Sequence, residues 1–258
     1  AAGSAFLRGT GGISLAIAPS ADPNEFRFSV KTDNSGTSNN DQFTITTAPP
    51  STGTFDYTVT TSDGTSSSGL NGAHTITFPS GPGTYDVVIT GAFPGVKFNN
   101  GGDKLKILTI DNFGIYAGGS NSQNAAFLGC SNLIVNATDT GNFGSVTDFT
   151  LFFGVTNITS FPLIDISSSF SFYFSFINSS ALTTFPANFF DDSSATLYQQ
   201  SFNGTNLTQQ SIDNILVSID ASGATNGTFN QSGGSAPSST GVAAKDSLVA
   251  KGWTVTTS

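Results

Sequence analysis

Charged residues are scarce in this sequence. They make up 10% of the 258 residues, against roughly 25% in an ordinary globular chain, and Glu25 is the only glutamate. Solvated helices usually carry Lys, Glu and Arg on their outer face, so the shortage favours strands and turns. Hydrophobic residues reach 37% and phenylalanines number 24, which is enough for a sizeable core. The composition predicts a mainly β protein.

Basic residues are few and scattered. Eight Lys and Arg stand against 17 Asp and Glu, and none of the eight lies between Lys106 and Lys245. Phosphate groups are bound by clustered Lys and Arg, so we expect no nucleic-acid partner and no attraction to anionic membranes. No run of 18 apolar residues occurs, and membrane insertion is not expected.

Cys130 is the only cysteine, so no internal disulfide can form. A single cysteine is more often a small buried hydrophobe than a reactive thiol, and Cys130→Ser is expected to lower stability without changing an activity. Methionine is absent. We expect that either an initiator or a longer leader has been removed, and the sequence does not distinguish the two.

Residue sets for catalysis are missing. The single histidine, His74, is far from Cys130 and in a different predicted domain, and no HExxH, GxSxG or P-loop pattern occurs. We expect His74 to be structural. Asp191 and Asp192 are expected to form a solvated turn, with a calcium role as the lesser alternative. The prediction is a protein that is not an enzyme, with no catalytic, cofactor-binding or metal-binding residue assigned.

Oxygen ligands for calcium are available on predicted loops at Asp33, Asp41 and Asp63, but none of these loops has alternating ligand spacing. Calcium is kept only as a secondary expectation, and no other cofactor is predicted. Seven Asn-x-Ser/Thr sequons occur, about as many as the abundance of Asn, Ser and Thr gives by chance, so they do not predict glycosylation. They are Asn136, Asn157, Asn178, Asn203, Asn206, Asn226 and Asn230.

Short strand patterns fill residues 25–98. Apolar residues alternate within 26–30, 43–45, 55–59, 74–78 and 85–89, separated by turn signals such as Asp63-Gly64 and Ser80-Gly-Pro-Gly-Thr84. Five or six such strands predict a small antiparallel sandwich.

Three stretches of this segment carry a family resemblance: Tyr57-Thr-Val-Thr-Thr-Ser-Asp-Gly-Thr65, His74-Thr-Ile-Thr-Phe78 and Gly83-Thr-Tyr-Asp-Val-Val-Ile89. They resemble a PKD-like module of the immunoglobulin type. The family usually has Trp-Gly-Asp-Gly where this chain has Thr61-Ser62-Asp63-Gly64. The resemblance implies a structural histidine before a strand, which is the place of His74.

A second pattern follows residue 98. Ser131-Asn-Leu-Ile-Val-Asn136, Thr156-Asn-Ile-Thr-Ser-Phe-Pro162 and Ser180-Ala-Leu-Thr-Thr-Phe-Pro186 align at spacings of 25 and 24 residues, and Asn206-Leu-Thr208 continues the series. Units this short cannot bury their own apolar face, so we expect a solenoid with a shared core. Residues 131–136, 157–162 and 181–186 should be adjacent parallel strands, with a first strand at 103–110.

Two motifs within these units are characteristic of a family. Phe127-Leu-Gly-Cys-Ser-Asn-Leu133 has the form aromatic-x-Gly-Cys-Ser-x-Leu, and Phe161-Pro-Leu-Ile-Asp-Ile-Ser-Ser168 the form Phe-Pro-x-x-Asp-x-Ser-Ser. They resemble the BspA-like leucine-rich repeats of bacterial and phage surface proteins, whose later cysteine is replaced here near Asn178-Ser179. A PKD-like module, a Phe98-Asn-Asn-Gly-Gly-Asp103 junction and such repeats occur together in phage-encoded proteins. Together the resemblances cover about residues 26–258.

The aromatic segment 169–177, Ser-Phe-Ser-Phe-Tyr-Phe-Ser-Phe-Ile, allows two interpretations. Strand alternation places the four phenylalanines on one face, whereas helical spacing groups Phe170, Tyr173, Phe174 and Ile177. The repeat phase favours a short helix or turn. An uncharged aromatic segment aggregates when exposed, so we expect it to be buried in the solenoid or in a subunit interface.

The two ends of the chain have separate roles in this prediction. Residues 1–24 form an apolar arm whose Leu7, Ile13, Leu15 and Ile17 dock on the chain's own sandwich or on a neighbouring subunit. Residues 209–258 cap the solenoid with a helix near 211–219, a loop to Ser239, a helix at 240–252 and a strand from Trp253. The predicted organisation is arm 1–24, PKD-like sandwich 25–98, leucine-rich repeats 99–208 and cap 209–258.

The resemblance implies a structural or adhesive surface protein. We expect a bacteriophage virion appendage (a fibre, spike or capsid-attached protein), at the virion surface or otherwise extracellular, that meets a host receptor or glycan. The alternative is a cell-encoded bacterial adhesin, and a third interpretation is a secreted carbohydrate-binding or hydrolytic module. Low charge gives little repulsion between copies, and phage fibres are most often trimers. A homo-oligomer, with a trimer favoured, and other virion proteins are the expected partners.

Overall fold

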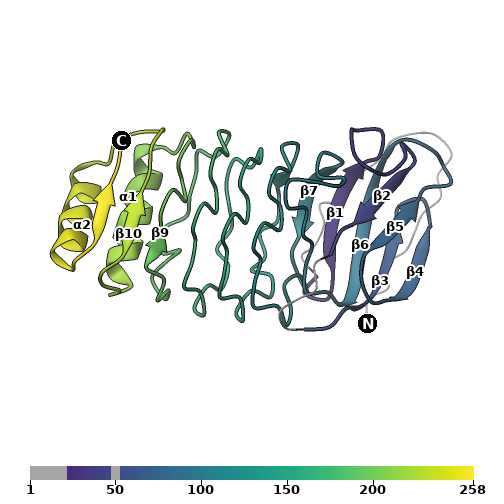
Figure 1. The fold of residues 1–258 in the computed structure, drawn as a ribbon, viewed down its shortest axis with the longest axis horizontal. Helices are drawn as coiled ribbons and strands as arrows, with labels where there is room; N and C mark the ends of the chain where they lie inside the picture. The colour runs from purple at the N-terminus through teal and green to yellow at the C-terminus, as the bar shows by residue number, and fades with distance from the viewer. Residues whose placement is uncertain (1–21, 48–52) are drawn as a thin grey trace.

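The computed structural model describes residues 22–47 and 53–258. The predicted arm therefore lies outside the described residues, apart from its last three. The molecule is elongated, with β-sheets at one end, stacked passes of chain in the middle and two helices at the other end (Figure 1). Strands outnumber helices in the described part of the chain, which confirms the predicted mainly β fold.

Two sheets form the N-terminal end. The larger one has the order β4-β3-β6-β1-β7-β8, and the smaller one pairs β2 with β5. All pairs except β7 with β8 are antiparallel, and all five predicted strands of this region form. The strands are β1 Phe26–Lys31, β2 Gln42–Ile45, β3 Asp56–Thr61, β4 Ser66–Leu70, β5 His74–Thr77, β6 Thr84–Ala92, β7 Ile107–Asn112 and β8 Ile134–Val135.

Apolar residues that alternate along the strands fill the space between the two sheets. Phe26, Phe28 and Val30 of β1 are at most 2% exposed, as period-2 alternation requires of a half-buried strand. The rings of Phe28 and Phe43 join the two sheets, with centroids 5.8 Å apart. Burying a side chain of this size stabilises the fold by about 1.5–3 kcal/mol.

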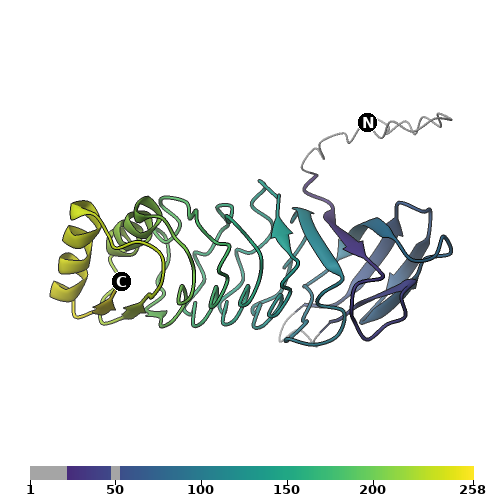
Figure 2. The ribbon, with the colours of Figure 1, turned by 90° about the horizontal axis from the view of Figure 1, so that it is seen from above.

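The larger sheet continues beyond residue 98. β7 pairs with β1, and β8 pairs in parallel with β7, so one sheet takes strands from both sides of the predicted domain boundary (Figure 2). The strand expected at 103–110 begins only at Ile107, because residues 103–106 form a turn.

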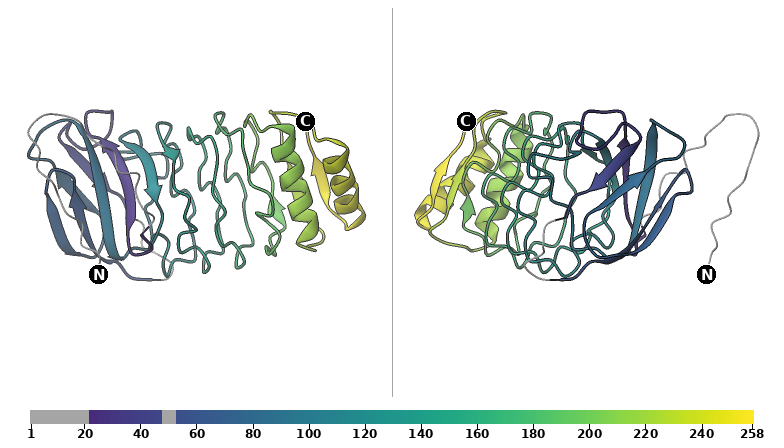
Figure 3. Two further views of the ribbon diagram at one scale, coloured as in Figure 1. Left: turned by 180° about the vertical axis from the view of Figure 1, so that it is seen from behind. Right: turned by 45° about the vertical axis from the view of Figure 1, so that its right-hand side comes forward.

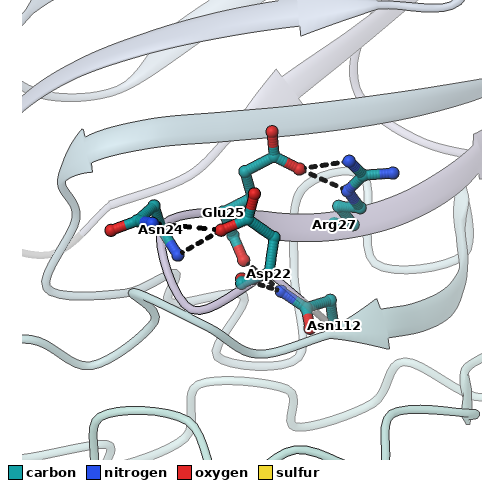
Figure 4. A network of polar contacts seen from close by, with 5 residues as sticks. All are labelled: Asp22, Asn24, Glu25, Arg27 and Asn112. Carbon is teal, nitrogen blue, oxygen red and sulfur yellow. Dashed lines mark hydrogen bonds and ion pairs between the residues drawn. The ribbon is translucent and has the colours of Figure 1, made fainter. Parts of the chain in front are cut away.

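A polar network fixes the chain where it enters β1 (Figure 4). The Asp22 carboxylate accepts hydrogen bonds from the backbone and side-chain nitrogens of Asn24, at 2.9 and 3.1 Å, and Glu25 pairs with Arg27. Asn112, at the end of β7, donates from its side-chain amide to the backbone carbonyls of Asp22 and Glu25. These bonds hold the segment before β1 against the end of β7.

Beyond β8 the chain makes successive passes that lie side by side (Figures 2 and 3). Isolated parallel bridges join Ser122 to Asp148, Asp148 to Ser171 and Ser171 to Leu197, at separations of 26, 23 and 26 residues. The series goes on through three short parallel strands, β9 Leu197–Tyr198, β10 Thr228–Asn230 and β11 Thr254–Thr256. We call this series of parallel pairs the ladder.

The residues that pair in the ladder are not those of the predicted strands. Only Ile134–Val135 of segment 131–136 is a strand, and segments 157–162 and 181–186 contain none. These two segments still lie together, because the backbone nitrogen of Thr183 donates to the carbonyl of Thr159 at 3.1 Å. Proline cannot donate to a ladder, and both segments end in one. Their aligned apolar residues are anchors in the core instead: Leu133, Ile158, Leu182 and Leu207 are fully buried.

The aromatic segment 169–177 forms a bridge residue followed by turns. The predicted turn is present. The two groupings of aromatic side chains predicted for a strand and for a helix are both wrong. Phe172 and Phe176 point into the core at 2% and 1% exposure, whereas Phe170 is 58% exposed. Phe174 adopts a left-handed backbone with φ of 57°. That conformation reverses the chain between the two buried rings, so neither strand nor helix periodicity applies.

The C-terminal helices and last strand form as predicted. α1 spans Gln209–Ala221 and α2 spans Ser239–Ala250, and the hydroxyls of Thr208 and Ser238 cap their N-termini. The helices pack against each other at the far end of the molecule (Figure 3). The segment predicted as a loop up to Ser239 contains β10, because Phe229 is fully buried and extends the ladder.

Candidate functional site

Two columns of stacked aromatic rings form the interior of the passes. In the first, Phe127, Phe153, Phe176 and Phe202 lie 4.8, 6.3 and 5.3 Å apart with interplanar angles of at most 16°. In the second, Phe149, Phe172 and Tyr198 lie 5.1 and 5.6 Å apart and are nearly parallel. Buried side chains in regular contact hold the backbone in place, so the surface of the passes is rigidly supported from inside.

Left-handed residues recur at equivalent positions of the passes. Ala125, Leu151, Phe174 and Gln200 have φ between 56° and 57°. Four residues further along each pass, Gly129, Val155, Asn178 and Gly204 have φ of 81°, 58°, 56° and 73°. The separations of 26, 23 and 26 residues are those of the ladder, so the passes share one backbone path although their sequences differ.

The outward residues of the ladder form what we call the ladder face. Inward Phe149, Phe172 and Tyr198 alternate with outward residues on both sides, and the bridges fix the register of neighbouring passes. The ladder face comprises Ser122, Asn124, Asp148, Thr150, Tyr173, Leu197, Gln199, Thr228 and Asn230, none of which is buried, whereas Ser171 in the same row is only 4% exposed.

Hydroxyl and amide groups dominate the ladder face. Asp148 is its one charged residue, and its carboxylate accepts from the backbone nitrogen of Thr150 at 2.9 Å and the hydroxyl of Ser122 at 3.4 Å. The hydroxyls of Thr150 and Ser171 are 3.1 Å apart across neighbouring passes. No basic side chain belongs to this face.

Two exposed apolar side chains belong to neighbouring passes. Phe170, one residue before the bridge at Ser171, is 58% exposed, and Leu197 on the next pass is 38% exposed. The backbone nitrogen of Phe170 donates to Thr147 at 2.9 Å, and that of Phe172 donates to Leu197 at 2.9 Å. Tyr173 is partly exposed.

A second polar cluster is buried between the sheets and the first pass. Asp103 is fully buried, and its carboxylate accepts from the backbone nitrogens of Thr37, Ser38 and Thr44 at 2.8, 3.0 and 2.7 Å. Lys106, 1% exposed, donates to the carbonyls of Asn39 and Gln42 and to both oxygens of Ser38 at 2.7–3.1 Å. The cluster fixes the loop between β1 and β2 and has no solvent access.

Burial and hydrogen bonding act in opposite directions on Asp103. Burial raises the pKa of its carboxyl, but the bonds from Ser38 and Thr44 and the charge of Lys106 outweigh burial, so its pKa lies below the ordinary value. Burial lowers the pKa of Lys106. A charged pair so fully enclosed is a structural element rather than a site for a ligand.

His74 and Cys130 are not brought together as a catalytic pair. His74 is the first residue of β5 and pairs with Ile45 of β2, and partial burial lowers the pKa of its imidazole. Cys130 is fully buried within the core of the passes, and burial raises the pKa of its thiol well above the ordinary value. A buried, protonated thiol is a poor nucleophile.

Cys130 belongs to a column of small buried residues. The equivalent positions of the later passes hold Thr156, Ser179 and Thr205, all at most 5% exposed. The hydroxyls of Thr156 and Thr205 donate to Phe153 and Phe202 carbonyls at 2.9 and 2.7 Å, and that of Ser179 donates to Phe153 at 2.7 Å. Ser179, at the position equivalent to Cys130, fills the same space and keeps its hydroxyl bonded.

The aspartates considered for calcium are dispersed. Asp33 forms an ion pair with Lys31 at 3.6 Å, Asp63 accepts from the hydroxyl of Thr61 at 2.6 Å, and Asp191 accepts from Ser218 at 2.5 Å. Asp192 is exposed. Within residues 22–47 and 53–258, no group of three or more His, Cys, Asp or Glu residues lies close enough to hold a metal ion.

Sequence reasoning missed both the ladder face and the Asp103–Lys106 cluster. The ladder residues have no common motif. They share only their position in the stack, which the buried rings behind them set. The sequence predicted a strand at Asp103 and Lys106. The cluster is revealed only by the hydrogen bonds that Ser38 and Thr44 donate to the Asp103 carboxylate in the folded chain.

No helix in the described part of the chain is long and apolar enough to cross a membrane. No known protein family, curated protein or solved structure matches this chain.

Proposed function

We propose that the chain combines a PKD-like, immunoglobulin-type sandwich with a BspA-like leucine-rich-repeat solenoid closed by a helix–strand cap, and that it is a structural and adhesive protein of a bacteriophage virion surface. In this proposal it is a fibre, spike or capsid-attached appendage. The observation that carries the proposal is the continuous aromatic core, which runs from the sheets through every pass to Trp253.

A core of this form supports an elongated molecule. Each ring in the columns contacts the ring before and after it, as Phe176 does with Phe153 and Phe202. Stacked units of this kind extend a surface along one direction without needing a globular core. An extended rod with a rigid face suits a protein that presents side chains at a distance from the particle that carries it.

Fractionation of particles and cells tests the virion assignment. We expect antibodies against the purified chain to label banded virus particles and to leave the washed cell envelope unlabelled. Labelling confined to the envelope would contradict the proposal and favour the cell-encoded adhesin. A cytoplasmic protein from the same culture serves as the control for carry-over into either fraction.

The apolar arm is proposed to attach the appendage and to join its copies, with a trimer as the favoured state. Asn112 holds the backbone of Asp22 at the end of β7, so the segment that follows the proposed arm has a fixed place. Deleting residues 1–20 should lower the mass in solution and prevent incorporation into particles. A truncated protein that keeps its oligomeric state and still assembles would remove the arm from the proposal.

A further inference from the structure

We propose that the outer side of α2, together with the open edge of β11, joins two copies of this chain end to end about a two-fold axis. The α2 part of this surface, which we call the end face, consists of Val242, Lys245, Asp246 and Val249. It lies at the opposite end of the molecule from the sheets (Figure 1). The inference goes beyond the proposed function and does not depend on it.

The outer side of α2 is apolar. Val242 is 44% and Val249 52% exposed, whereas Gly241, Ala244 and Leu248 on the inner side are buried. The last unit of a stack normally turns a polar side outward, because no further unit covers it. Two exposed valines on one helix therefore mark an interaction surface.

The exposed valines point away from α1. The side-chain nitrogen of Lys251 lies 2.8 Å from the Asp220 carboxylate of α1, which identifies the side of α2 that faces α1. Val242 precedes Lys251 by nine positions, about two and a half helical turns, so it lies on the opposite side. Val249 follows Val242 by seven positions, about two full turns, and shares that side. Since α2 is the outermost helix (Figure 3), both valines face outward from the stack.

The open edge of β11 is a second, independent observation. β11 is the edge strand of its sheet and pairs only with β10 among residues 22–47 and 53–258. Val255 pairs with Phe229 and contacts the core, but it is only partly buried because no further described pass covers it. Unpaired edges are templates for another chain, and charged side chains on the edge usually prevent such pairing. β11 has none.

The charges of the end face favour a second copy of this chain as its occupant. Lys245 and Asp246 have opposite charges, and the Asp246 carboxylate makes no hydrogen bond or ion pair within the described parts of the chain. An antiparallel second α2, related by a two-fold axis midway between these residues, brings Lys245 of each copy to Asp246 of the other. The same axis brings Val242 of each copy to Val249 of the other. The end face is therefore complementary to itself, as a two-fold interface requires.

Other arrangements fit the end face less well. Parallel α2 helices would set Lys245 against Lys245 and Asp246 against Asp246 of the second copy, and like charges repel each other. A head-to-tail contact with β4, the opposite edge of the larger sheet, offers Asp246 no charged group, because β4 is Ser-Ser-Ser-Gly-Leu. A two-fold axis that crosses the middle of α2 and of β11 also reverses β11, so the two β11 strands meet as an antiparallel pair.

Sedimentation equilibrium of the full chain tests the contact. Val249→Lys places a charge in the apolar part of the end face and should lower the average mass about twofold, because a two-fold contact joins copies in pairs. Val217→Lys is the matched control, since Val217 is a 40% exposed valine on α1. Both side chains are exposed, so neither variant should change the melting temperature appreciably. Equal masses for the wild type and Val249→Lys, or an equal effect of Val217→Lys, would overturn the proposal.

Exchanging the charges tests the two-fold axis itself. Lys245→Asp and Asp246→Lys each leave charges of one sign on the end face, so each variant should associate at least about tenfold more weakly than the wild type. An equimolar mixture of the two variants should regain the wild-type mass, because a negative end face then meets a positive one. Mixing would not repair a merely structural defect. A mixture that fails to associate would contradict the antiparallel arrangement.

Deleting residues 1–20 separates this contact from the proposed arm. In the truncated chain, Val249→Lys should still lower the mass about twofold, and without that substitution the mass should level off at two copies as the concentration rises. Loss of the Val249→Lys effect would mean that the arm occupies the end face, and a mass that keeps rising would indicate head-to-tail association. Either result overturns the proposal. The particle fractionation is independent of these outcomes, so it tests the proposed function separately.

Discussion

The sheets and the passes bury their phenylalanines in different ways. Between the sheets, the angle between neighbouring rings varies widely, from 17° between Phe78 and Tyr85 to 71° between Tyr57 and Phe93. Within the passes, rings at equivalent positions are almost parallel, with 9° between Phe176 and Phe202. Two facing sheets interlock side chains of different origin, whereas stacked passes superimpose the same position again and again.

The backbone hydrogen bonds also differ between the sheets and the passes. In the sheets, continuous ladders such as β1 with β6 satisfy the polar groups over six paired residues. In the passes, single hydrogen bonds satisfy the backbone polar groups, and turns lie between them. Examples are the bonds from the Phe127 nitrogen to the Phe152 carbonyl and from the Phe153 nitrogen to the Ser175 carbonyl. A regular strand pattern is therefore unnecessary for parallel stacking, provided that each pass turns at the same place.

Removing one ring from a column should have the largest effect. Phe176→Ala leaves a cavity between Phe153 and Phe202 and should lower the free energy of unfolding by about 4 kcal/mol. Chemical denaturation measures the change. Phe170→Ala is the control within the same segment, because its ring is mostly exposed, and it should cost less than about 1 kcal/mol. Equal losses would mean that the columns do not carry the stability of the passes.

The buried Asp103 should come next. Asp103→Asn removes a buried carboxylate that accepts several hydrogen bonds and the negative charge that acts most strongly on Lys106, so we expect a loss of about 3 kcal/mol. Asp33→Asn is the control, since its ion pair with Lys31 is exposed and should contribute less than about 1 kcal/mol. A small loss for Asp103→Asn would mean that the Asp103–Lys106 cluster contributes little to the stability of the contact between the sheets and the passes.

Asp103 should also give the fold a dependence on acid. Its pKa in the folded chain lies below the ordinary value of 3.8, so the folded state binds a proton less readily than the unfolded state. The resulting stabilisation is fully present above the unfolded pKa and is lost as the pH falls through the folded pKa. Urea titrations at a series of pH values below neutrality should show a weaker decline for Asp103→Asn than for the wild type.

One substitution in the passes should stabilise the protein. Val155 has φ of 58°, where Gly129, Asn178 and Gly204 hold the equivalent positions. A left-handed backbone costs an ordinary side chain about 1–2 kcal/mol, and asparagine tolerates it better. Val155→Asn should therefore raise the free energy of unfolding by about 1 kcal/mol. The reverse exchange, Asn178→Val, should lower it, and the same sign for both would contradict a shared backbone path.

The smallest effect is expected at Cys130. Its serine replacement can donate to the Phe127 carbonyl, as the hydroxyl of Thr156 does to Phe153, so Cys130→Ser should lower the free energy of unfolding by only about 0.5 kcal/mol. Ser179→Ala should cost more, because it leaves the backbone nitrogen of Thr156 without its partner. A thiol reagent should label Cys130 only after unfolding. Labelling in the folded state would contradict its burial.

The sequence by itself determined the elements that depend on local chemistry. Alternating apolar residues predicted β1, β2, β3, β5 and β6, and the patterns at 211–219 and 240–252 predicted the two helices. Leu133, Ile158, Leu182 and Leu207 were recognisable as anchors at even spacing, and all four are buried. These features follow from side-chain period and capping, which neighbouring residues alone can encode.

Only the tertiary structure decided which segments pair. The ladder runs through Ser122, Asp148, Ser171 and Leu197, which have no common residue type, because the stacked rings behind them set their register. The same holds for Asp103, whose partners lie about sixty residues earlier in the chain. Contacts of this range depend on how complete passes and sheets fit together, and a local pattern does not contain that information.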